Sequence, residues 1–176
     1  MNKIFSISNG LRLAVMALAV AGTGSAIAAT ASADSTSTVV APIKITKGAD
    51  LSFGTFAGGS TQGTVTVSPN GARVADGGAV LMGGTVTAAR FDVEGAAGAT
   101  YSITLGGSTQ LTSGTDTMAF TTVSDLAGGA ITSGNVDSGA LTAGTQSIYV
   151  GGVLTVGAEQ AAGTYTGSVE ATVEYN

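Results

Sequence analysis

The sequence ends in a stretch in which side chains alternate strictly between two faces. From Gly163 to Asn176, Tyr, Gly, Val and Ala take every second position, and Thr, Ser and Glu take the positions between them. A period of two is that of a β-strand with one buried face. Because the sequence ends at Asn176, we expect the second edge of this strand to pair with an earlier strand, with another chain or with water. A long apolar edge exposed to water promotes aggregation. If an earlier strand of the same chain covers this edge, the protein is a self-contained domain; if another chain covers it, the protein is an assembling subunit.

Short strand-like runs, each bounded by glycine, occupy much of the remaining chain. They cover residues 38–46, 51–56, 64–68, 79–82, 85–94, 100–105, 117–123, 146–156 and 164–175. Regular short runs without helical periodicity favour a single antiparallel β-sandwich or barrel over alternating β and α units. The sequence therefore predicts an all-β fold. A Gly-, Ser- and Thr-rich stretch at residues 125–145 predicts loops with one short strand.

Glycine pairs and alternating apolar residues predict the turns and the core. Expected turns include Pro69-Asn70-Gly71, Asp76-Gly77-Gly78, Gly83-Gly84, Gly106-Gly107 and Gly151-Gly152. The core candidates are the bulky residues that share a strand face in two neighbouring runs, namely Phe91, Val93, Tyr101, Ile103 and Leu105.

The first residues have the pattern of a secretory signal peptide. Lys3 and Arg12 precede an apolar run at residues 13–21, and a small-x-small site ends at Ala28. We expect a signal helix over residues 1–28, cleaved after Ala28, with cleavage after Ala33 as the alternative. The apolar run is too short for a membrane-spanning helix. The pattern predicts a secreted protein that passes through the periplasm to the cell surface or the medium.

The composition of the mature chain limits its partners and its chemistry. Four cations against 11 carboxylates give it a net charge of −7, which disfavours binding to nucleic acid and to anionic membrane surfaces. The chain has no cysteine and no histidine, so most nucleophile-and-base arrangements are excluded. We expect no enzymatic activity, no cofactor, no metal and no small-molecule substrate.

Some carboxylates are weak candidates for a catalytic or calcium-binding site. Asp92 and Glu94 share a strand face, as the two catalytic carboxylates of a glycosidase could. We favour the interpretation that both side chains simply lie on a solvent-exposed face. Four aspartates in turn-rich segments could contribute to a calcium site, yet none has the D-x-D-x-D-G spacing. Capping of their own turns is the favoured interpretation; the four residues are Asp76, Asp116, Asp125 and Asp137.

Several segments, in this order, resemble the DUF4402 family. They are LSFGTF at 51–56, YSITL at 101–105, YVGGVLTV at 149–156, QAAGTYTG at 160–167 and the alternating end at Tyr175. The resemblance covers residues 39–176. DUF4402 is in turn similar to spore coat U-type bacterial surface proteins, which include archaic chaperone-usher pilins. The shared elements are L-x-F-G near the first strands and Q-x-x-G-x-Y-x-G before an alternating strand that ends in Tyr.

The resemblance implies an immunoglobulin-like, pilin-like sandwich that lacks its last strand. In chaperone-usher pilins, a periplasmic chaperone or the N-terminal extension of the next subunit fills the groove beside the final strand. Carried over, this groove would be lined by residues at the C-terminal end of the chain, namely Tyr165, Val169, Val173, Tyr175 and Asn176. The implied partners are other surface subunits, a periplasmic chaperone and an outer-membrane usher.

The N-terminal extension leaves two alternatives for the missing strand. Residues 29–38 contain only Ala, Ser, Thr and Asp, and Val39, Val40, Ile43 and Ile45 follow directly. Small side chains bury little surface in a groove. Either another subunit supplies the strand, or the segment from Val39 to Ile45 folds back and completes its own domain.

We therefore expect a non-enzymatic, exported structural subunit of a fimbria- or coat-like bacterial surface structure, assembled by β-strand addition at its C-terminal strand. The sandwich would span residues 39–176. The alternative is a self-contained secreted module that binds glycan or matrix for adhesion, although aromatic residues, the usual platforms for sugar rings, make up only 5% of the chain.

Overall fold

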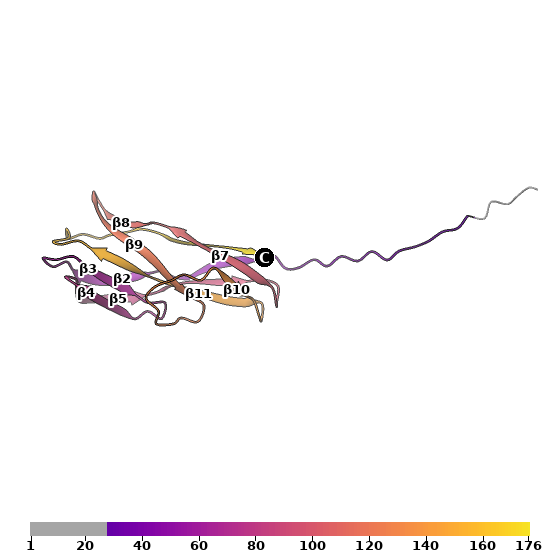
Figure 1. The fold of residues 1–176 in the computed structure, drawn as a ribbon, viewed down its shortest axis with the longest axis horizontal. Coiled ribbons are helices and arrows are strands. Elements are labelled where there is room, and N and C mark those ends of the chain that lie inside the picture. The colour runs from indigo at the N-terminus through magenta and orange to yellow at the C-terminus, as the bar shows by residue number, and fades with distance from the viewer. Residues whose placement is uncertain (1–27) are drawn as a thin grey trace, which may run out of the picture. The chain divides into compact units, whose positions relative to one another are not determined.

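The computed structural model describes residues 28–176, shown in Figure 1. The chain divides into two units, Met1–Ser37 and Thr38–Asn176. The described part of the first unit, residues 28–37, is exposed and has no regular secondary structure. The predicted signal helix falls on residues outside the described part, apart from Ala28. No helix in residues 28–176 is both long and apolar enough to span a membrane.

All regular secondary structure in the second unit is β-strand, as predicted. Its strands are β1 (Lys44–Ala49), β2 (Ser52–Ala57), β3 (Gly63–Val67), β4 (Arg73–Gly77), β5 (Val80–Thr87), β6 (Ala89–Glu94), β7 (Thr100–Gly107), β8 (Gln110–Ser113), β9 (Asp116–Asp125), β10 (Ser138–Ala140), β11 (Thr145–Val156) and β12 (Val169–Tyr175). Every strand pair is antiparallel. The fold is an antiparallel β-sandwich.

The strands form one large sheet, one smaller sheet and a separate two-stranded ribbon. The large sheet has the order β1-β6-β11-β3-β4, with β9 on the other edge of β11 and β8 beside β9. The smaller sheet has the order β10-β7-β12. The ribbon consists of β2 and β5. Strand β11 is the centre of the large sheet, because it pairs in succession with β6 and β3 and also with β9.

The prediction of a turn at Gly151-Gly152 was wrong. Both glycines lie inside β11 and are buried. A side chain on Gly151 would collide with the carbonyl of Val67, and one on Gly152 would collide with the ring of Phe120. These glycines let neighbouring strands approach β11 closely, which is the other established role of glycine within a strand.

The core consists of two clusters of buried apolar residues. The first contains Phe53, Val65, Val67, Ala79, Met118, Phe120, Leu154 and Val156. The second contains Ala89, Val93, Tyr101, Ile103, Leu141, Ile148 and Val150. Among the predicted core residues, Val93, Tyr101 and Ile103 are buried, whereas Phe91 and Leu105 are half-buried against the second cluster.

Both ends of the domain contain less regular strand than the alternation predicts. The first strand starts at Lys44 instead of residue 38, directly after the segment that contains Pro42, which has no backbone N–H to donate. The last strand starts at Val169 instead of residue 164, and only Thr166 before it forms a bridge, to Thr112. The loop at residues 126–144 contains the short β10, as predicted. Strands β4 and β8 were not predicted, since both are short and largely exposed.

Candidate functional site

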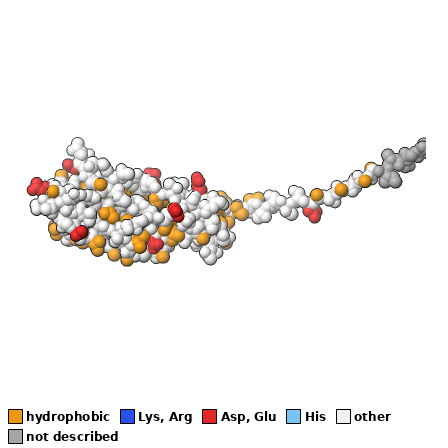
Figure 2. Space-filling view, viewed as in Figure 1, with side chains coloured by type: hydrophobic (Ala, Val, Ile, Leu, Met, Phe, Trp, Pro, Cys, Tyr) orange, Lys and Arg blue, Asp and Glu red, His pale blue; other side chains and the backbone are white. Residues whose placement is uncertain are grey.

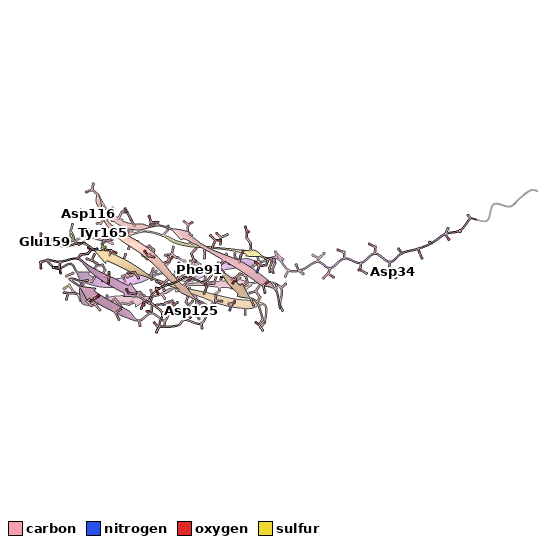
Figure 3. All side chains as sticks on the ribbon, viewed as in Figure 1. Asp34, Phe91, Asp116, Asp125, Glu159 and Tyr165 are labelled. Atoms are coloured by element: carbon pink, nitrogen blue, oxygen red, sulfur yellow. The ribbon has the colours of Figure 1, made fainter. Side chains whose placement is uncertain are left out.

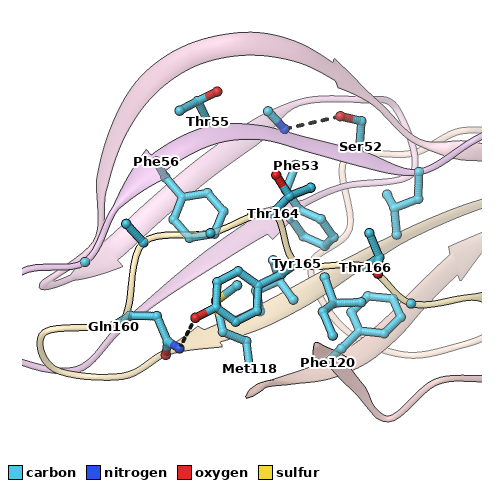
Figure 4. A pocket seen from close by; sticks show the side chains of 18 of the residues that line it. Ser52, Phe53, Thr55, Phe56, Met118, Phe120, Gln160, Thr164, Tyr165 and Thr166 are labelled. Carbon is cyan, nitrogen blue, oxygen red and sulfur yellow. Dashed lines mark hydrogen bonds between the residues drawn. The ribbon is translucent and has the colours of Figure 1, made fainter. Parts of the chain in front are cut away.

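A groove of about 880 Å³ lies between β2 and the segment that leads into β12 (Figure 4). One wall is residues 51–58 and the opposite wall is residues 160–169. The floor comes from residues of β8, β9 and β11, namely Leu111, Met118, Phe120 and Leu154. No charged side chain lines the groove. Its walls and floor therefore suit an apolar or neutral occupant.

Each wall borders the groove through consecutive residues. A strand that turns one face to a cavity would contribute every second residue; a continuous run indicates that the edge of the chain faces the groove. Strand β2 pairs only with β5 among the described residues. On the opposite wall, Thr166 exchanges backbone hydrogen bonds with Thr112, and the carbonyl of Ser168 accepts one from the Ser108 amide, 2.9 Å each. The far side of this wall is thus occupied by β8 and the end of β7.

Two edges without a strand partner therefore face each other across an apolar floor. Strand β12 continues the second wall and pairs only with β7 in the described part of the chain. At about 3.3 Å per residue, the six residues of β2 present an edge of about 20 Å. Backbone N–H and C=O groups on such an edge are free to pair with an added strand.

An aromatic pair joins the β2 wall to the floor. The rings of Phe53 and Phe120 meet edge to face, with their centroids 6.0 Å apart. Figure 4 shows the ring of Phe56 on the same wall, opposite Thr164 and Tyr165. Phe53, the second residue of β2, is buried in the first core cluster and anchors the wall, while Thr55 remains exposed.

A hydrogen-bond network holds the opposite wall and accounts for the Q-x-x-G-x-Y pattern. The Tyr165 hydroxyl accepts a hydrogen bond from Nε2 of Gln160 and donates one to the carbonyl of Ala161, both at 2.8 Å. Oε1 of Gln160 accepts the Gly157 amide at 3.0 Å, and its Nε2 also donates to the Thr117 carbonyl at 3.3 Å. Gln160 and Tyr165 thereby close the loop between β11 and the groove wall.

The five residues named from the resemblance occupy different parts of this region. Tyr165 and Val169 line the groove. Val173 and Tyr175 lie farther along β12, on its half-buried face against the second core cluster. Asn176 is exposed and continues the pairing with β7, since its amide donates to the Thr100 carbonyl at 3.2 Å. Ala28 is exposed and lies outside the sandwich.

The amino-acid pattern did not predict that β2 forms one wall of the groove, nor which residues form its floor. The L-x-F-G segment, quoted only for its resemblance, supplies Leu51, Phe53 and Gly54 to the groove. A signal for this wall was present, because Phe53 and Phe56 are two of only five phenylalanines in the chain. Their convergence with Met118 and Phe120 depends on tertiary packing and has no counterpart in local spacing.

In the described chain, the N-terminal segment folds onto the domain but does not pair with β12. Strand β1 pairs with β6 in the large sheet, whereas β12 lies in the smaller sheet and pairs with β7. Ile43 and Ile45 pack against the second core cluster. Val39 and Val40 are 93% and 59% exposed, so in the described chain they do not fill the groove.

The carboxylates that were weighed as catalytic or calcium-binding groups have structural partners or lie apart. Asp92 accepts a hydrogen bond from Ser147 at 2.7 Å and forms an ion pair with Arg90 at 3.2 Å. Oδ2 of Asp125 accepts the amides of Ala127 and Gly129, which is the turn-capping role. No group of three metal-ligating side chains of the His, Cys, Asp or Glu type is found within residues 28–176.

Acidic side chains are scattered over the face of the domain shown in Figure 2. Glu170 and Glu174 lie on the exposed face of β12, while two of the cations are paired locally, Lys47 with Asp50 at 2.7 Å and Arg90 with Asp92. Figure 3 places Glu159 near Tyr165 at the same end of the domain. Glu159 is thus an acidic residue close to the neutral groove.

Comparison with known proteins bears on the whole sandwich. The model of the family described as "Domain of unknown function (DUF4402)" matches residues 43–175. A search of curated proteins finds no match. The matched region extends from the residue before β1 to the last residue of β12 and includes both groove walls. The chain therefore belongs to the DUF4402 family.

Proposed function

We propose that this protein is a non-enzymatic, exported structural subunit of a bacterial cell-surface structure, and that it accepts a β-strand from another subunit in the groove between β2 and residues 160–169. The observation that carries the proposal is the apolar groove between the edge of β2 and the segment that leads into β12, neither of which has a strand partner on the groove side among the described residues. An inserted strand would pair with both edges and join the ribbon to the smaller sheet.

The energetics favour a strand over other occupants of this groove. Unpaired backbone groups at a strand edge gain hydrogen bonds from an added strand, and this backbone pairing requires no particular side-chain sequence. Side chains that point to the floor would cover Met118, Phe120 and Leu154. Each fully buried Val or Leu contributes about 1.5–3 kcal/mol. An alternating apolar strand therefore matches both the edges and the floor.

The export part of the proposal rests on the pattern at the N-terminus. A basic start, an apolar run and a cleavage site at Ala28 direct the chain out of the cytoplasm. An open edge is an aggregation hazard during transit, so a periplasmic chaperone would cover the groove until an outer-membrane usher and the next subunit replace it. These partners follow from the resemblance to chaperone-usher pilins. The role we propose for the finished protein is in a fimbria- or coat-like assembly with an adhesive function.

A groove-filling substitution tests the proposal. Ala162 is exposed and lines the groove, whereas Ala130 is exposed in a loop outside it. We expect Ala162→Trp to abolish assembly of the purified mature chain, measured by size-exclusion chromatography and electron microscopy, while Ala130→Trp assembles as the wild type does. A wild-type chain that remains a soluble monomer, alone and with extracts of its own outer membrane, would contradict strand acceptance. That outcome would favour the self-contained binding module.

A further inference from the structure

The β2 wall of the groove contains an irregularity in its pairing with β5. The pairing of β2 with β5 shifts register between Phe53 and Thr55 and again between Thr55 and Phe56. Gly54 lies at this bulge with φ of 66°, a conformation that favours glycine. A bulge interrupts the ladder and leaves backbone groups without their regular partners. The carbonyls around Gly54 therefore need a donor from elsewhere.

Arg73, the first residue of β4, supplies this donor. Its Nη1 lies 2.6 Å from the carbonyl oxygen of Phe53 and 3.2 Å from those of Thr55 and Gly83. One amino group has two hydrogens, so the three acceptors share them. The charge of the guanidinium strengthens such bonds relative to neutral donors. Arg73 thus holds both strands of the ribbon at the bulge, and we call this group of contacts the Arg73 clamp.

Gly54 makes the Arg73 clamp possible. A Cβ atom at position 54 would collide with Nη1 of Arg73, and it would also lie 2.7 Å from the carbonyl oxygen of Gly83. Glycine is therefore required at this position of the L-x-F-G segment for two reasons: a side chain would occupy the space of the guanidinium, and φ is positive. Leu51 and Phe53 of the same segment pack against the core. Leu51 and Phe53 thus anchor the wall in the core, and Gly54 leaves room for the guanidinium.

The ribbon depends on such connections because it is a separate two-stranded sheet. A two-stranded hairpin has marginal stability by itself. Its described links to the sandwich include the Phe53–Phe120 contact below the groove, the hydrogen bond from the Glu159 amide to the Gly59 carbonyl at 2.7 Å, and the Arg73 clamp. Of these, the Arg73 clamp acts at the middle of β2, where the edge faces the groove.

We infer that Arg73 is a positioning residue for strand acceptance: its guanidinium holds the bulged centre of β2 so that this wall presents its edge to an incoming strand. The inference rests on the proposed function. Without Arg73, the carbonyls of the bulge turn to water and the centre of β2 gains freedom that must be lost again on binding. Affinity for a strand then falls although the sandwich stays folded.

Binding of a synthetic strand provides the main test. The probe is a fluorescein-labelled peptide with the sequence Lys-Val-Thr-Val-Thr-Val-Thr-Val-Lys, titrated with the folded mature chain and followed by fluorescence anisotropy. We expect Arg73→Met to weaken binding about tenfold, as loss of about one hydrogen bond's net contribution implies, and Arg73→Lys to weaken it less. Arg90→Met is the matched control, because Arg90 pairs with Asp92 away from the groove, and it should bind as the wild type does.

Hydrogen exchange separates positioning from general destabilisation. In Arg73→Met, the amides of residues 53–57 should exchange at least about tenfold faster, while those of β11 keep their protection. Ile148→Val removes a methylene from the second core cluster and should lower overall stability without selective loss at residues 53–57 or weaker peptide binding. If Arg73→Met does not fold, the same two measurements on Arg73→Lys decide.

The outcomes distinguish the two proposals. An Arg73→Met variant with wild-type affinity overturns the role of Arg73 in strand acceptance, whatever its exchange at residues 53–57, and leaves strand acceptance itself intact. A folded wild-type chain that binds neither the peptide nor another copy overturns strand acceptance, whereas faster exchange at residues 53–57 in the variant would still support the Arg73 clamp as the support of β2.

Discussion

The hydroxyl of Tyr175 donates a hydrogen bond to the carbonyl of Ala41, with 2.8 Å between the oxygens. The same hydroxyl accepts the Ala96 amide at 2.7 Å. One side chain near the end of β12 thereby connects the segment before β1 with the turn between β6 and β7. The terminal aromatic of the alternating strand ties together three parts of the domain that are far apart in sequence.

Tyr175→Phe should lower the free energy of unfolding by about 1 kcal/mol, because it removes both hydrogen bonds and keeps the packing of the ring. The measurement is urea denaturation, with hydrogen exchange of the Ala96 amide as a local readout. Tyr149→Phe is the control, since the Tyr149 hydroxyl has no hydrogen-bond partner among the described side chains and backbone. Equal stability of the two variants would contradict the connecting role of Tyr175.

Gln160 and Tyr165 should be energetically coupled. We expect the double variant Gln160→Ala, Tyr165→Phe to be about 1 kcal/mol less destabilised than the sum of its two single variants, because each single change already breaks the 2.8 Å hydrogen bond between them. A double-mutant cycle from urea denaturation gives this coupling. Additive effects would show that the bond does not hold the groove wall.

Tyr101 should make stability depend on alkaline pH. Burial raises the pKa of Tyr101 above its ordinary value of 10.0. The unfolded chain then releases the phenolic proton at lower pH than the folded chain, so the stabilisation is complete below the unfolded pKa and is lost as pH rises through the folded pKa. We expect the free energy of unfolding to fall as the pH rises above about 10.

The difference between wild type and Tyr101→Phe isolates this contribution. The variant also loses the 3.1 Å hydrogen bond to Gln146, which shifts its stability by a nearly constant amount below pH 9 or so. Above that range, the difference between the two proteins should shrink, because only the wild type has a Tyr101 proton to lose. A difference that stays constant up to about pH 11 would show that Tyr101 does not titrate differently in the two states.

Gly151→Ala should destabilise the domain by about 3 kcal/mol, because its Cβ would collide with the carbonyl of Val67 in the neighbouring strand β3. Gly106→Ala is the matched change within a strand. Its Cβ would meet only Cβ of Glu170, at an ordinary 3.9 Å, so we expect a change within about 0.5 kcal/mol. Thermal denaturation of both variants checks the prediction, and similar melting temperatures would refute it.

Much of the fold could be predicted from local pattern. The alternation in Tyr101 and Ile103 predicted the buried face of β7, and the run at 146–156 predicted β11. Period two reports which face is buried, and that information is local. The turn assigned to Gly151-Gly152 failed because glycine serves turns and close strand packing alike. Only the positions of Val67 and Phe120 distinguish the two roles.

The candidate site could be predicted in part. The family resemblance implied a groove lined by Tyr165 and Val169, and both residues line the groove of the structure. Its other wall and its floor could not be predicted, because Phe53, Met118 and Phe120 are brought together by pairings across long sequence separations. The role of Arg73 could not be predicted, because a lone arginine cannot be distinguished from a solvent-exposed one until its hydrogen-bond acceptors are known.

The sequence by itself determined an all-β chain, a half-buried last strand and a part of the core that includes Val93, Tyr101 and Ile103, because side-chain alternation follows directly from the geometry of a single strand. The tertiary structure decided which strands pair, that β2 and β12 each keep one edge without a strand partner in the described chain, and that an apolar floor lies between β2 and residues 160–169. Strand pairing and cavity shape depend on contacts between distant segments. The alternation that includes Val169 and Val173 predicts which face of β12 is buried. Only the tertiary structure shows which segments lie beside the edges of β12.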